Sequence, residues 1–74
     1  MMMVSDATPH VESLTVRERE LAHAVSRGLR NRDIAREFGI SEETVKKHLA
    51  NIYGKLALAG RVQLTIHLLR GGAV

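Results

Sequence analysis

The chain has 74 residues, of which 45% are hydrophobic, a net charge of +3 and no cysteine. A chain of this length supports one small domain with a thin core, and without cysteine it has neither disulfides nor a thiolate zinc site. The charge is uneven, because residues 1–13 carry −2 and the rest of the chain carries +5. This mild basic excess fits a polyanionic partner but does not identify one.

No segment predicts export or a membrane span. Met1–Val4 is followed by polar residues and not by the apolar core of a signal peptide. The longest apolar stretch, Leu64–Leu69, contains a threonine and a histidine and is far shorter than the roughly 20 residues that a span needs. We therefore expect a cytoplasmic protein without a membrane partner.

The amino-terminal part of the domain begins with a helix-start signal. Residues 1–13 are polar, mixed and broken by Pro9, so we expect a disordered leader or linker there. Thr15 and Glu18 then form a T-x-x-E capping box, in which each side chain accepts a bond from the other residue's backbone amide. The apolar positions of this first helix lie on one side: Leu21, Ala24 and Val25. Gly28 stops it.

Residues 31–56 predict two amphipathic helices joined by a tight corner. The first has one apolar stripe, formed by Ile34, Ala35 and Phe38. Gly39 can take the left-handed conformation that turns the chain sharply after it. Ser41 follows, and its hydroxyl can accept a bond from an amide at the start of the next helix. This arrangement is a helix-turn-helix.

The helix predicted over about 42–56 has two different faces. Its buried face is expected to hold the apolar residues that recur at helical spacing, Val45, Leu49, Ile52 and Leu56. The opposite face holds Glu43, Lys47, Ala50 and Gly54, flanked by Lys46 and Asn51. A strip of cations, an amide and small residues lets a helix lie close against a negatively charged surface.

After a loop over 57–60, a fourth helix is expected over about 61–69, followed by a flexible tail at 71–74. This helix carries two apolar stripes: Leu64 and Leu68 on one face, and Val62, Ile66 and Leu69 on another. A small domain needs only one of them for its core. We therefore predict an all-α fold of four helices without a sheet, as one domain over 14–70.

Three motifs in this order resemble the LuxR-type (GerE-like) DNA-binding domain of bacterial transcription regulators and response regulators. They are LTVRERE at the first helix, GLRNRDIAREFGIS across the second helix and turn, and TVKKHLANIYGKL in the third. Each alone is weak, but they occur in the family's order and close to its usual spacing. The resemblance runs from Leu14 to about Leu69, which is about three quarters of the chain. The resemblance implies a four-helix helix-turn-helix domain that binds double-stranded DNA.

The resemblance also implies which residues of the third helix read bases. Lys46, Lys47 and Ala50 match positions that meet base edges in the major groove, and Asn51 is a further candidate. A lysine can donate to guanine, and an alanine can touch a thymine methyl group. The alternative is that both lysines only solvate the helix and pair with Glu42 and Glu43 one turn earlier.

Phosphate contacts are expected at two places. The edge of the third helix offers Thr44, His48 and Lys55, and the start of the second offers Arg30, Asn31 and Arg32, where the helix dipole favours an anion. His48 can equally pack at the rim of the core. The four histidines are dispersed without a pair at i, i+3 or i, i+4, so we expect no metal site.

Two positions depart from the family's pattern. Arg30 stands where a Ser or Thr usually caps the second helix, so either Asn31 takes the cap or the helix is less well capped. Ala59 and Gly60 stand where Asn or Asp often caps the fourth helix, so its start is expected to fray.

The family uses its last helix for dimer formation, so we expect a homodimer through Val62, Ile66 and Leu69. The alternative is that both stripes are partly buried within the monomer. RNA polymerase is a further candidate partner. We expect no cofactor and no small-molecule ligand in this chain.

Other function classes fit the sequence less well than DNA binding does. A protein-interaction module can use the same helical core, but the cationic third helix argues against it. Sigma-factor-like promoter recognition fits the RERE start and the fourth helix less well. No paired carboxylates, nucleophile with a base or phosphate-binding glycine loop suggest an enzyme. Family members usually carry an amino-terminal receiver or ligand-sensing domain, for which this chain has no room, so we expect either a cut fragment or a stand-alone regulator.

Overall fold

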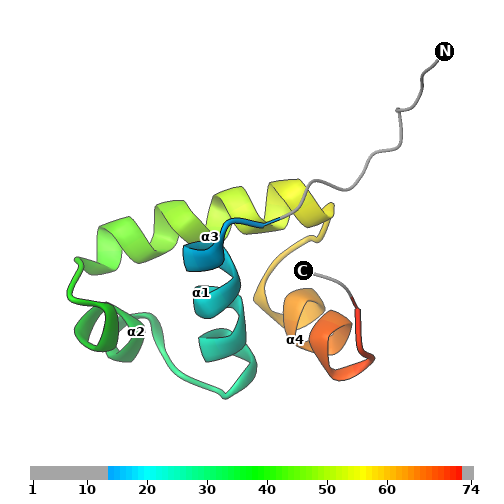
Figure 1. Ribbon diagram of the computed structural model, residues 1–74, viewed down its shortest axis with the longest axis horizontal. Helices are drawn as coiled ribbons and strands as arrows, with labels where there is room; N and C mark the ends of the chain where they lie inside the picture. The colour runs from blue at the N-terminus through cyan, green and yellow to red at the C-terminus, as the bar shows by residue number, and fades with distance from the viewer. Residues whose placement is uncertain (1–13, 73–74) are drawn as a thin grey trace, which may run out of the picture.

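The computed structural model describes residues 14–72, which fold into four helices without a strand. These are α1 (Val16–Ser26), α2 (Asn31–Phe38), α3 (Glu42–Leu56) and α4 (Arg61–Leu69). Helix α3 is the longest and lies along one side of the molecule, while the other three lie beneath it (Figure 1). The predicted all-α, four-helix fold is confirmed. The predictions for residues 1–13 and 73–74 lie outside the described residues.

The predicted capping box at the start of α1 is present. The Glu18 amide donates to Thr15 Oγ1 at 3.1 Å, and the Thr15 amide donates to Glu18 Oε1 at 2.9 Å. Two backbone donors that the helix leaves without a partner are thereby satisfied. The same carboxylate also faces α3.

Left-handed residues follow the ends of α1 and α2. Gly28 has φ +86° and Gly39 has φ +68°. At each end the next residue reaches back to the last turn: Leu29 donates to the Ala24 carbonyl, and Ile40 donates to the Ala35 carbonyl. The glycine amides donate as well, from Gly28 to the Val25 carbonyl and from Gly39 to the Arg36 carbonyl. Each pair of bonds closes its helix in the Schellman pattern. The tight corner predicted between α2 and α3 is therefore confirmed.

The core collects at least one fully buried side chain from each helix. The five largest are Leu21, Ile34, Val45, Ile52 and Leu64. All four apolar residues predicted to form the inner face of α3 are buried, and Leu14, which precedes α1, is buried as well. Helix α1 lies in the middle and packs against each of the other three. Burial of one α3 stripe therefore holds the helix-turn-helix to the rest of the domain.

Helix α4 is the least buried element. It packs mainly against α1, and only Leu64 is buried, with Leu68 partly covered. The second stripe is exposed: 63% at Val62, 43% at Ile66 and 76% at Leu69. The structure therefore does not support the alternative in which both stripes are partly buried within the monomer. No helix within residues 14–72 is long and apolar enough to cross a bilayer.

Glycines flank α4 at both ends. Its first residue, Arg61, follows Gly60, which is extended and supplies no side-chain cap, as the sequence predicts. At the other end, the Gly72 amide donates to the His67 carbonyl at 2.8 Å. Gly71 and Gly72, placed in the tail by the sequence, therefore close the helix.

The end of α3 uses a left-handed residue that is not glycine. Ala57 has φ +56°, and Leu58 donates to the Tyr53 carbonyl as in the other helix ends. A β-carbon in this conformation costs about 1–2 kcal/mol relative to glycine. Glycine loses more conformational freedom on folding, so a glycine at this position would recover only part of that cost.

We expect Ala57→Gly to raise the free energy of unfolding by about 0.5–1 kcal/mol, because glycine adopts this conformation without strain. Urea denaturation followed by circular dichroism measures it. The matched control is Ala59→Gly in the same loop, where φ is not positive. It should be neutral or destabilising, and an equal gain from both substitutions would contradict the explanation.

Candidate nucleic-acid interface

The outer face of α3 is a strip of exposed small and cationic residues. Lys46, Lys47, Ala50 and Asn51 are all exposed, on the side opposite the buried stripe. Gly54 continues the strip, and a β-carbon placed there would meet nothing within 4 Å. No described segment covers this face, so a flat partner can approach the helix along its length.

The two lysines of this strip are not engaged within the domain. Neither Lys46 nor Lys47 forms an ion pair or hydrogen bond with another described residue. The alternative in which they pair with Glu42 and Glu43 is therefore not what the structure shows. Both ammonium groups remain available to an anion outside the domain.

The start of α3 is well formed. Ser41 Oγ accepts from the Thr44 amide at 3.0 Å, and the two hydroxyls lie 2.9 Å apart. Glu42 and Glu43 lie in the first turn, where the helix dipole favours negative charge. Thr44 and His48 are half-buried along the edge of the helix, a position that fits both packing of His48 at the rim of the core and contact with a phosphate.

Lys55 has an internal partner that sequence reasoning missed. Its Nζ lies 2.8 Å from Oε1 of Glu18, whose side chain is only 8% exposed. The hydrogen bond from Lys55, followed by that from the Thr15 amide, lowers the pKa of Glu18, although burial opposes the shift. A phosphate contact by Lys55 stays a prediction, and it would have to compete with this ion pair.

The start of α2 resolves one question left open by the sequence. The helix begins at Asn31 with Arg30 as its N-cap, so the alternative in which Asn31 takes the cap is wrong. A guanidinium has no acceptor, so the Arg30 side chain cannot cap the helix; instead the Arg30 amide donates to Asp33 Oδ2 at 3.3 Å. Arg30 and Arg32 are exposed, while Asn31 is half-buried.

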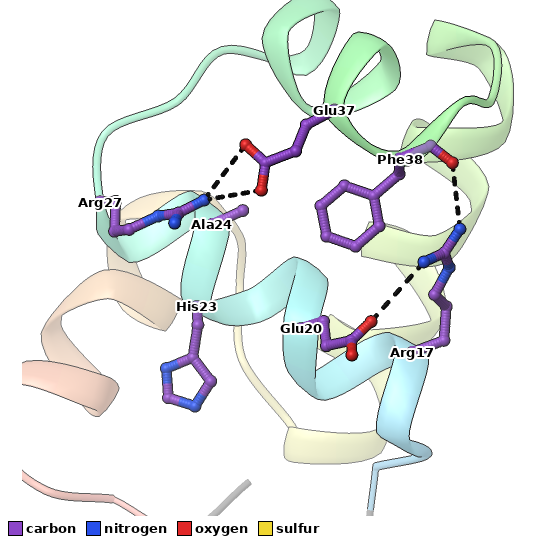
Figure 2. Close-up of a pocket in the computed structure, with 7 residues that line it drawn as sticks. All are labelled: Arg17, Glu20, His23, Ala24, Arg27, Glu37 and Phe38. Carbon is purple, nitrogen blue, oxygen red and sulfur yellow. Dashed lines mark hydrogen bonds and ion pairs between the residues drawn. The ribbon is translucent and has the colours of Figure 1, made fainter.

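A shallow depression between α1 and α2 is lined by charged residues that bond to one another or to the backbone (Figure 2). Arg17 lies over the Phe38 ring at 4.6 Å and donates to its carbonyl at 3.1 Å. Arg27 pairs with Glu37 at 3.2 Å. These contacts brace the helix-turn-helix against α1. Among residues 14–72, no three histidines or carboxylates gather as a metal site.

The sequence matches the family described as bacterial regulatory proteins, luxR family, over residues 12–68. The chain belongs to this family. Its members are transcription regulators and not enzymes, so the predicted resemblance and the helix-turn-helix architecture are both confirmed.

Individual members of the luxR family are similar over most of this chain. The spore germination protein GerE of Bacillus subtilis is 42% identical over 59 residues, which are 80% of each protein. The nitrate/nitrite response regulator protein NarP of Escherichia coli is 44% identical over 77% of this chain and 26% of its own length. The HTH-type transcriptional regulator Mb0914c of Mycobacterium bovis is 48% identical over 82% of this chain and 7% of its own length. Apart from GerE, the chain thus matches only a minor part of these relatives.

The ion pair between α1 and α3 predicts a loss of stability in acid. The folded state holds the pKa of Glu18 below its ordinary value of 4.5, so the pair stabilises the domain above that pH. Stability should then fall as the pH drops through the lowered pKa and the carboxylate is protonated. At pH 7, Glu18→Gln should reduce the free energy of unfolding by about 1–3 kcal/mol.

Denaturation between pH 7 and pH 3 measures this dependence. The control is Glu20→Gln, which removes an exposed carboxylate of the same helix. The wild type and this control should lose stability in acid more steeply than Glu18→Gln does. Parallel curves for all three proteins would show that the pair does not cause the dependence.

Proposed function

We propose that residues 14–70 bind double-stranded DNA sequence-specifically as part of a transcription regulator, with α3 in the major groove. The observation that carries this proposal is the exposed face of α3, where two lysines without an internal partner lie beside Ala50 and Asn51. Membership of the luxR family supports it. The proposed activity places the protein in the bacterial cytoplasm, where its DNA partner is.

The proposed division of labour separates base readout from attachment. Lys46, Lys47, Ala50 and Asn51 would read base edges, since these residues can enter the groove without steric obstruction. Phosphates would be held by Arg30, Asn31 and Arg32 at the start of α2, and by Thr44 and His48 beside the strip. Counterion release by the basic groups would supply most of the affinity and make it fall with salt.

The exposed stripe of α4 supports a homodimer on DNA. Val62, Ile66 and Leu69 are too exposed to serve the protomer's own core. A second copy that covers this stripe would place two recognition helices on two related half-sites.

In vitro selection from random duplexes tests the function directly, because an enriched sequence reports base readout. Gel shifts on unrelated duplex at low and high salt provide the control. A protein that binds no duplex under either condition would be a protein-interaction module, and the proposal would fail.

Removing a reading residue and an attaching residue should have different effects. We expect Lys47→Ala to weaken binding to the selected sequence by roughly tenfold or more, with a smaller loss on random duplex. Arg32→Ala should weaken both alike, because it holds phosphate only. Fluorescence anisotropy at fixed salt measures all four dissociation constants. Equal specificity losses for the two variants would refute the division.

The dimer has its own test in the double substitution Val62→Glu and Leu69→Glu. Charges on the exposed stripe should abolish the complex of two protomers per duplex and leave the fold intact. Sedimentation velocity with selected duplex measures the stoichiometry. Val16→Glu on α1, where the side chain is 66% exposed, is the matched control and should not change it. One wild-type protomer on a selected site with two half-sites would contradict the proposal.

A further inference from the structure

The first residues of α2 and α4 are joined by one side-chain contact. Arg61 Nη2 donates to Oδ1 of Asn31 at 2.7 Å, across 30 residues of sequence. Arg61 begins α4 and is exposed, and Asn31 begins α2 and is half-buried. A bond at this surface contributes little to stability. Its importance lies in the group that it orients.

The contact determines which way the Asn31 carboxamide faces. A guanidinium only donates, so the atom that meets Arg61 has to be the carboxamide oxygen. The NH₂ group is therefore turned away from Arg61 with both of its hydrogens available. In this position an asparagine presents donors and no acceptor, which suits a phosphate.

The backbone at this point presents donors as well. The amides of Asn31 and Arg32 donate to no acceptor among the described residues, as expected for the first turn of a helix. Arg30 and Arg32 add positive charge on either side. The oriented carboxamide thus belongs to a group of donors that can act on one anion.

We propose that Arg61 is a positioning residue for DNA binding: it holds the Asn31 carboxamide with its NH₂ group directed at a phosphate. This inference rests on the proposed function and adds a residue of α4 to the residues proposed to support DNA binding. It assigns Arg61 no phosphate of its own. The two residues therefore act as one unit, which a double-mutant cycle can detect.

The cycle compares Asn31→Ala, Arg61→Ala and the double variant on the duplex selected by the wild-type protein. Each single substitution should weaken binding roughly three- to tenfold, as expected for the loss of one hydrogen bond. The double variant should bind the selected duplex with the same affinity as the single variant that binds it less tightly. Arg70→Ala, which removes an exposed arginine at the other end of α4, is the charge-matched control.

Salt dependence separates positioning from direct phosphate binding. The slope of log Kd against log salt should be nearly the same for Arg61→Ala and the wild type, whereas loss of a direct phosphate contact would change it by about 0.9. Thermal melts of each variant check that the fold is intact.

Additive losses, an unchanged affinity for either single variant, or a changed slope for Arg61→Ala would overturn the inference. Failure of the wild type to bind any duplex would instead overturn the proposed function, so the two failures are distinguishable.

Discussion

Burial of one apolar stripe on α3 is the interaction on which the rest of the domain depends. Val45, Leu49, Ile52 and Leu56 are covered by the other helices, and their burial fixes how α3 rotates about its own axis. The lysines are on the outside only because these four are on the inside. Each buried side chain of this size contributes about 1.5–3 kcal/mol, far more than any one exposed charge. In this domain, apolar packing therefore determines which charged side chains of α3 face outward.

Local signals in the sequence are sufficient to predict the helices and their ends. The capping box at Thr15, the glycines at 28 and 39 and the serine cap at 41 all act within a few residues, and each one is present. The stripe on α3 was readable for the same reason, because helical periodicity alone determines which residues share a face. The start of α2 is harder to predict, because Arg30 is not a residue that normally caps a helix and the sequence allows two possible first residues.

The contacts missed from the sequence join residues that lie far apart in it. Glu18 and Lys55 are separated by 37 positions, and Asn31 and Arg61 by 30. Whether such side chains meet depends on how the helices cross, and no local pattern encodes that. Lys55 shows the consequence: its place on the helix edge suggested a phosphate contact, but the structure pairs it with a carboxylate of α1. The sequence predicts two apolar stripes on α4, but only the packing of the helices determines which of them stays exposed.

The weak anchoring of α4 couples assembly to order elsewhere. One fully buried leucine and the partly buried Leu68 anchor this helix, and its first turn has no side-chain cap. By thermodynamic linkage, any molecule that covers its outer stripe also stabilises the folded form of the helix. Its first residue is Arg61, which holds Asn31 on α2. A molecule that covered this stripe would therefore also stabilise the bond from Arg61 to Asn31 at the amino end of α2.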